Sequence, residues 1–142
     1  MTMQRSQAQT RFEISTKDQL SVTDITAQVH AAVPDDLTGI ITVFVEHTTA
    51  AITVNEAEKR LQDDFETALN ELIDDTGWRH NEIDGNADSH IRAMLIGASA
   101  TIPIEDGELA TGTWQSVLLI ECDGPRTRTV SVTATPAVNS HT

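Results

Sequence analysis

The sequence has little cysteine and no long apolar run. Its single cysteine, Cys122, cannot form an internal disulfide, so nothing indicates an oxidising compartment. No segment reaches the roughly 18 consecutive apolar residues that a membrane-spanning helix needs. Residues 1–15 lack the apolar core of a signal peptide. We therefore expect a cytoplasmic protein with no membrane partner.

Positive charge is also scarce. Nine lysines and arginines face 22 aspartates and glutamates, so the formal net charge is −13, and Lys17 and Lys59 are the only lysines. Nucleic acids and anionic membranes bind basic surfaces, so we expect neither as a partner. Acidic, lysine-poor surfaces suit concentrated salt, which screens self-repulsion. The composition favours a halophilic protein, with an ordinary acidic mesophilic protein as the alternative.

A length of 142 residues suits one domain. We expect a core over about residues 11–135 and flexible termini. Residues 113–122 are apolar on both faces, Trp114 included, which is typical of a central strand. Residues 123–125 are expected to turn that strand back as a hairpin. The predicted strands span residues 11–16, 40–45, 99–104, 113–122 and 128–135.

Apolar residues at helical spacing predict three helices. The second is expected to begin at Asn55, because Asn55 and Glu58 have the spacing of a capping box. The third is expected to begin at Asn86 or Asp88 and to end at Gly97. Strands cluster at the ends of the chain and helices in its middle, which favours an α+β fold with a mostly antiparallel sheet. The predicted helices lie within residues 21–33, 55–73 and 86–96.

Three of the five histidines follow a break in the predicted structure. His47 ends a strand, His80 follows a Gly-Trp corner, and His90 lies near the start of a helix. Their spacing along the chain matches no local zinc motif, so only the fold could bring them together. The alternative is three separate, hydrogen-bonded histidines. His30 and His141 have no such setting and look incidental.

Polar groups beside these histidines suggest an anion site. Thr48 and Thr49 place two hydroxyls next to His47, and a helix start at Asn86 lies close to His90. Free backbone N–H groups at a helix N-terminus attract anions. A phosphate held by these groups and an arginine is physically reasonable.

Two carboxylates complicate that picture. Asp84 and Asp88 would repel a phosphate unless a divalent cation such as Mg²⁺ or Zn²⁺ intervenes. The alternative is that Asp84 and Asn86 only form the turn and the helix cap. Glu56 is most simply a carboxylate in the first turn of a helix, and it matters for the site only if it faces His47.

Glu121 lies on the strand that is expected to be central, so it needs a partner. Arg126 and Arg128, across the predicted hairpin, are within reach, and a structural ion pair is the simpler interpretation. Cys122 is expected to be a small buried side chain. The chain has no GxSxG, P-loop or GxGxxG motif, so serine hydrolases, P-loop nucleotidases and dinucleotide oxidoreductases lack support.

The segment SATIPIEDGELATGTWQSV, residues 99–117, closely resembles the signature of the YjbQ-like family. This is an uncharacterised family to which a secondary thiamine-phosphate synthase activity is ascribed. The GTWQ tetrapeptide in that frame is specific, and the resemblance covers about residues 11–135. Further landmarks agree in order and spacing, namely His47-Thr48-Thr49 with Asn55-Glu56, the lone His80, and the segment from Asn86 to His90.

The resemblance implies a compact α+β domain built on a β-sandwich-like antiparallel sheet, commonly assembled as a homotrimer. It implies a divalent metal, Zn or Mg, or an anion at His47, His80 and His90, and no organic cofactor. The family commonly has a second acidic residue where this chain has Gly85, whereas Asp88 is an acid the family pattern lacks. The cleft that the family resemblance implies would gather His47, Thr48, Thr49, Glu56, His80, Asn86 and His90.

The resemblance also implies a reaction, which joins a pyrimidine methyl pyrophosphate to a thiazole phosphate and releases pyrophosphate. The three histidines would hold the metal or the pyrophosphate, and Thr48, Thr49 and Asn86 would donate hydrogen bonds. Glu56 would orient a histidine or act as general acid or base, and Arg92 or Arg128 would complete an anion clamp. A metal-dependent hydrolase of a small phosphorylated substrate and a non-enzymatic small-anion binder are the alternatives.

Overall fold

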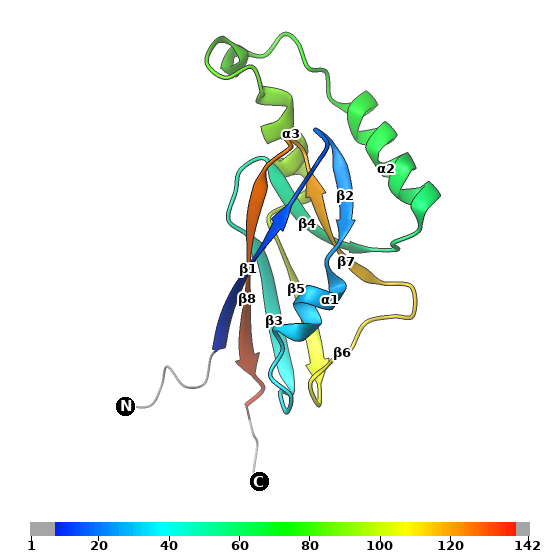
Figure 1. Ribbon diagram of the computed structural model, residues 1–142, viewed down its shortest axis with the longest axis vertical. Helices are drawn as coiled ribbons and strands as arrows, with labels where there is room; N and C mark the ends of the chain where they lie inside the picture. The colour runs from blue at the N-terminus through cyan, green and yellow to red at the C-terminus, as the bar shows by residue number, and fades with distance from the viewer. Residues whose placement is uncertain (1–7, 139–142) are drawn as a thin grey trace.

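Two antiparallel sheets and three α-helices form the fold in the computed structural model, which describes residues 8–138 (Figure 1). The expected α+β class is confirmed. Of the termini expected to be flexible, residues 8–10 and Pro136 are paired in a sheet, whereas residues 1–7 and 139–142, which include His141, lie outside the described residues. None of the described helices is long and apolar enough to cross a membrane.

The larger sheet has the strand order β1-β8-β3-β5-β6 and the smaller one the order β2-β7-β4. The strands are β1 (Ala8–Ser15), β2 (Ser21–Asp24), β3 (Gly39–Val45), β4 (Ala50–Asn55), β5 (Ser99–Glu105), β6 (Glu108–Leu109), β7 (Ser116–Glu121) and β8 (Thr127–Pro136). The helices are α1 (Thr26–Ala31), α2 (Lys59–Leu72) and α3 (Ala87–Ile96), with a short 3₁₀ helix η2 (Arg79–Glu82).

The main core lies between the two sheets. Strand β3 turns alternate residues inward, and Val43 at its centre is fully buried. Ile25, the residue just before α1, and Val29 within the helix add to the same core, as their helical spacing predicts. Strand β7 contributes Leu119 from the smaller sheet, so side chains of both sheets interlock in one apolar layer.

A second, smaller core covers the outer face of the smaller sheet. Strand β7 turns Leu118 and Ile120 toward this side, and helix α3 adds Ala93. Phe65 of α2 packs against the cluster, but Leu72 of the same helix stays exposed. Because β7 buries both of its faces and lies between β2 and β4, its prediction as a central strand is confirmed.

The predicted start of the second helix is wrong. Asn55 is the last residue of β4, where it pairs with Ser116 of β7, and α2 begins four residues later. Glu58 caps the helix instead, because its carboxylate accepts hydrogen bonds from the backbone N–H groups of Arg60 at 2.9 Å and Leu61 at 3.1 Å. Pairing in the sheet therefore overrides the local capping signal at Asn55.

Two predictions about β7 are also wrong. The strand begins at Ser116, so Trp114 precedes it and is 73% exposed. Residues 123–125 do not close a hairpin, because β7 and β8 belong to different sheets. The chain instead crosses from the smaller to the larger sheet between Glu121, the last residue of β7, and Thr127, the first residue of β8. This crossing brings both sheets together at one end of the molecule.

Candidate functional site

Two adjoining hollows lie at the end of the molecule where the chain crosses between the sheets. The polar cleft, about 700 Å³, opens between the loop after β3, the β7–β8 connection and the start of α3. The apolar groove, about 850 Å³, lies between the outer face of β3 and α3. Both volumes fall in the range of about 300–1,000 Å³ that is usual for ligand sites. The two hollows share Glu46, His47, Thr48 and His90.

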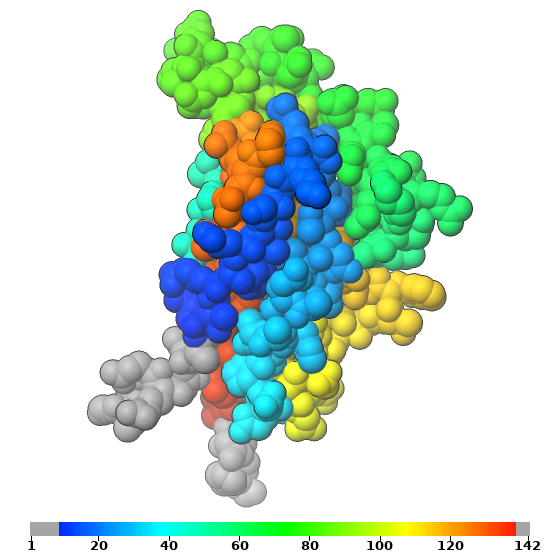
Figure 2. All heavy atoms as spheres, in the orientation of Figure 1, coloured from blue at the N-terminus to red at the C-terminus, as the bar shows by residue number. Residues whose placement is uncertain are grey.

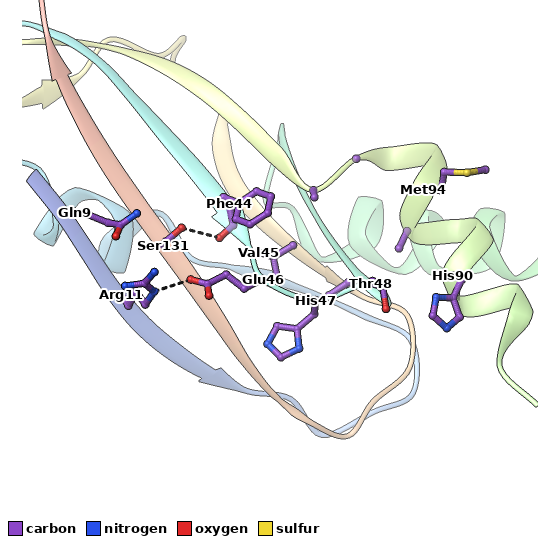
Figure 3. A pocket seen from close by; sticks show the side chains of 14 residues that line it. Gln9, Arg11, Phe44, Val45, Glu46, His47, Thr48, His90, Met94 and Ser131 are labelled. Atoms are coloured by element: carbon purple, nitrogen blue, oxygen red, sulfur yellow. Dashed lines mark hydrogen bonds and ion pairs between the residues drawn. The ribbon is translucent and has the colours of Figure 1, made fainter. Parts of the chain in front are cut away.

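Figure 3 shows how the groove is built. His47 and Thr48 follow the end of β3, and His90 and Met94 project from α3. Phe44 lies on β3, beside the Arg11–Glu46 ion pair, whose Nε–Oε2 distance is 2.8 Å. His47 and His90 therefore stand at the junction of a polar and an apolar surface.

The backbone sets the protonation of His47. The N–H of Thr129 on β8 donates a hydrogen bond to His47 Nε2 at 3.0 Å. Because Nε2 is the acceptor, the single proton of the neutral ring lies on Nδ1. Protonating Nε2 would set two N–H groups against each other. Burial, and then the positive charge of Arg128, also lower the pKa of His47 from its ordinary value.

This lowered pKa makes the stability of the protein depend on pH. Unfolded histidine titrates near pH 6.5, above folded His47, so the unfolded state binds more protons as the pH falls. The contribution of His47 is complete above pH 6.5 and is lost as the pH falls through the window below it. We expect His47→Gln to reduce the drop in unfolding free energy between pH 7.5 and 5.5, measured by urea denaturation.

The matched control for this prediction is Thr48→Ala, which changes the exposed neighbour of His47 and removes no titratable group. It should leave the pH dependence as in the wild type. An unchanged drop in His47→Gln would show that His47 is not the group responsible.

A buried ion pair fixes the loop that carries His47. The guanidinium of Arg128 donates to both carboxylate oxygens of Glu121, and the two side chains are 2% and 0% exposed. Arg128 Nη2 also donates to the hydroxyl of Thr49 at 2.9 Å and to its carbonyl at 3.0 Å. Two adjacent residues of β8 therefore hold the loop: Thr129 binds His47 at its start, and Arg128 binds Thr49 at its end. The structural ion pair predicted for Glu121 is present.

Arg126, which sequence reasoning proposed only as a partner for Glu121, is the arginine that opens onto the polar cleft. Its side chain is 53% exposed, and its Nη2 donates to Asp123 Oδ2 at 3.0 Å. The same carboxylate oxygen accepts a hydrogen bond from Asn86 Nδ2 at 2.9 Å. Arg126 precedes β8, whereas Arg128 lies within the strand on the same buried face as Val130 and Val132.

His80 reaches the site only through His90. Their ring centroids are 5.0 Å apart and the rings are nearly perpendicular, at 85°, an edge-to-face arrangement. His80 Nε2 lies 3.5 Å from Asp84 Oδ2 but makes no hydrogen bond within the described residues. His80 lines neither hollow, whereas His90 lines both.

The residues present do not fit a three-histidine metal centre within one chain. His47 has no free lone pair, because Nε2 accepts the Thr129 hydrogen bond and Nδ1 carries the proton. In the part of the chain that the structure describes, no group of three or more His, Cys, Asp and Glu side chains could hold a metal ion.

Three charged residues named from the sequence lie away from the cleft. Glu56 follows the far end of β4, a strand of six residues and so about 20 Å long at roughly 3.3–3.4 Å per residue. Arg92 is buried, and its guanidinium donates to the carbonyls of Leu69 at 2.8 Å and Ile73 at 2.7 Å. It also pairs with Asp88, so the Asp88 carboxylate is neutralised inside the protein. Arg92 therefore ties α3 to α2.

The hydroxyls of Thr48 and Thr49 have different surroundings. Thr49 is buried and accepts hydrogen bonds from Arg128, whereas Thr48 is exposed and lines both hollows. Gly85, where the family resemblance implies an acid, has a φ of +69°, a left-handed conformation that favours glycine. Of the predicted polar ligands, Thr48 is the hydroxyl that remains free for a bound molecule.

A family model described as "UPF0047 protein YjbQ-like" matches residues 10–137. A UPF0047 protein from Archaeoglobus fulgidus is 41% identical over 122 residues, which cover 85% of this chain and 96% of the relative. A crystal structure of a hypothetical protein from Aeropyrum pernix has a TM-score of 0.88 at 40% identity and covers 92% of this chain and 99% of its own. A YbjQ-like protein of unknown function from Sulfolobus solfataricus has a TM-score of 0.84 at 37% identity, covering 90% and 96%.

Proposed function

The chain belongs to the UPF0047 family of YjbQ-like proteins, and we propose that its polar cleft binds a small phosphorylated metabolite. The observation that carries the proposal is the hydrogen bond from Thr129 N–H to His47 Nε2. It leaves His47 as a neutral donor through Nδ1, and no described residue accepts a hydrogen bond from that atom. A phosphate oxygen is a suitable acceptor, with the hydroxyl of Thr48 and the guanidinium of Arg126 as further donors.

The charges around the cleft support an anion in spite of the net charge of the chain. Asp123 accepts hydrogen bonds from Arg126 and Asn86. Glu46 is paired with Arg11 on the groove side. Two of the three carboxylates that line the cleft are therefore compensated within the protein, and the third, Asp84, lies 3.5 Å from His80 Nε2.

The finer proposal is the thiamine-phosphate synthase reaction. The ring nitrogen of the thiazole phosphate attacks the methylene carbon of the pyrimidine methyl pyrophosphate. The new C–N bond forms as the C–O bond breaks, and pyrophosphate leaves with the electron pair. No proton has to move in this step, so the reaction needs no general base. His47, Thr48 and Arg126 would stabilise the departing pyrophosphate and hold it in line.

A non-enzymatic binder of small anions is the second candidate. It is favoured because His47 has no free nitrogen to act as a base and because Glu56 lies at the far end of β4. The metal-dependent hydrolase has less support, since the described residues contain no group of three ligands.

Calorimetry with pyrophosphate, followed by a turnover assay, tests the proposal. We expect pyrophosphate to bind and thiamine phosphate to form, with one pyrophosphate released per product, only when both substrates are present. Phosphate release without the thiazole would favour the hydrolase, and binding without turnover would favour the binder. No detectable binding of pyrophosphate would contradict the proposal as a whole.

A further inference from the structure

A further hollow of about 380 Å³ meets the polar cleft and is not used by the phosphate-binding groups. It lies between α3 and the segment that joins α2 to α3, which runs above α3 in Figure 1. Figure 2 shows this segment, in green, as the upper end of the molecule. The volume is within the usual range for ligand sites. The indole hollow, as we call it, is lined by Trp78, Arg79, His80, Ala87, His90 and Ile91.

The tryptophan of this hollow is fixed by the turn that carries it. Trp78 Nε1 donates a hydrogen bond to the carbonyl of Asp74 at 2.6 Å. Asn81 Nδ2 donates to the carbonyl of Asp75 at 2.9 Å and closes the same turn. The indole is nevertheless 39% exposed. Because Nε1–H is the single hydrogen-bonding group of an indole and is already engaged, the exposed part offers a flat apolar surface on which a ring can stack.

The other lining groups suit the edge of such a ring. Arg79 is exposed and forms no ion pair within the described residues, so its guanidinium is free to donate hydrogen bonds or to stack on a ring. His80 and His90 add two perpendicular imidazoles to the wall. An aromatic nitrogen heterocycle has apolar faces and a hydrogen-bonding edge, which matches this lining. An alkyl chain would desolvate the polar groups without giving them partners.

His90 connects the indole hollow to the polar cleft, because it lines both. His80 makes a second connection, since its Nε2 lies 3.5 Å from Oδ2 of Asp84, another residue of the cleft. A molecule whose phosphate lies in the cleft can therefore extend past His90 and place a ring against the indole. The two hollows then bind the two chemically different ends of one ligand.

We propose that the indole hollow binds an aromatic nitrogen heterocycle carried by the phosphorylated ligand of the cleft. The ring stacks on Trp78, and Arg79 donates a hydrogen bond to a ring nitrogen. Trp78 and Arg79 then determine specificity and take no part in holding the phosphate. This inference rests on the proposed function of the cleft and narrows its ligand class. In the synthase reaction, the ring is that of the pyrimidine methyl pyrophosphate.

Calorimetry with three pyrophosphate compounds tests the proposal. The probes are inorganic pyrophosphate, pyrimidine methyl pyrophosphate, and dimethylallyl pyrophosphate, an ester without a ring. We expect the pyrimidine ester to bind roughly 5–100-fold more tightly than the alkenyl ester, the amount that stacking one base on an aromatic side chain contributes. Trp78→Leu should remove this preference and leave the affinity for inorganic pyrophosphate unchanged. Trp78→Phe should keep most of the preference, because it retains a ring face although it loses the hydrogen bond to Asp74.

The matched control is Trp114→Leu, which changes the other tryptophan of the chain. Trp114 is 73% exposed and lines neither the cleft nor the indole hollow, so this variant should bind all three probes as the wild type does.

Equal affinities of the wild type for the two esters would overturn the ring site. So would equal losses in Trp78→Phe and Trp78→Leu, or a parallel loss of inorganic pyrophosphate in Trp78→Leu, because Trp78 would then only support the fold of the cleft. Binding of inorganic pyrophosphate without a preference for the ring would leave the proposed function standing and remove only this inference. A wild type that binds the pyrimidine ester but no inorganic pyrophosphate would contradict the proposed anion site instead.

Discussion

Replacing Arg128 with methionine is expected to lower the free energy of unfolding by about 3–5 kcal/mol. The substitution leaves the carboxylate of Glu121, which is 0% exposed, without its ionic partner. Thr16 Oγ1, at 2.7 Å from Glu121 Oε1, cannot compensate a full charge. The hydrogen bonds from Arg128 to Thr49 are lost as well. Urea denaturation of wild type and variant at neutral pH measures the effect.

Two controls isolate the cause of this loss. Arg126→Met removes an arginine of the same segment whose ion pair is half exposed, and should cost about 1 kcal/mol or less. The double variant Glu121→Leu with Arg128→Met removes both buried charges, and should be more stable than the sum of the single variants predicts. A loss in Arg128→Met no larger than that in Arg126→Met would contradict the role of the buried pair.

Substitutions of His47 are expected to separate ligand binding from folding. Asparagine keeps an N–H donor near the position of Nδ1, whereas glutamine keeps an acceptor for Thr129 N–H but withdraws the donor. A hydrogen bond to a charged group contributes about 1.5–3 kcal/mol, so His47→Ala and His47→Gln should weaken pyrophosphate binding by roughly 10–100-fold. His47→Asn should bind more tightly than either. Calorimetry of the three variants measures this order.

The stabilities of the same variants should follow a different order. His47→Gln can still accept the hydrogen bond from Thr129 N–H, whereas alanine leaves that donor without its side-chain partner. We therefore expect glutamine to be the most stable of the three in thermal unfolding, although it binds pyrophosphate weakly. If binding affinity merely tracked stability across the series, His47 would be supporting the fold and not donating to the ligand.

Local patterns in the sequence were enough to predict much of the fold. Val43 and its neighbours alternate because β3 has one face in the core, and the apolar run of β7 reflects burial on both faces. Helix α3 ends before Gly97, whose φ of +104° suits glycine. The capping signal at Asn55 gave a wrong prediction because pairing with a distant strand decides the conformation there. Asn55 pairs with Ser116 of β7 and ends β4 instead of starting a helix.

The candidate site was only partly predictable, because its chemistry depends on distant contacts. His47 and Thr48 could be identified as site residues, but the tautomer of His47 is set by Thr129, 82 positions further along the chain. Arg128 pairs with buried Glu121, and Arg126 opens onto the cleft, because the chain crosses between the two sheets at this point. No spacing in the sequence indicates that crossing.

The tautomer of His47 is the most direct test of the central claim. Long-range nitrogen–proton NMR spectra at pH 7.5, assigned by comparison with His47→Gln, identify which ring nitrogen carries the proton. We predict a neutral ring protonated at Nδ1, with Nδ1 as the nitrogen that responds when pyrophosphate is added. A ring protonated at Nε2, or on both nitrogens at that pH, would contradict the anion site proposed for this cleft.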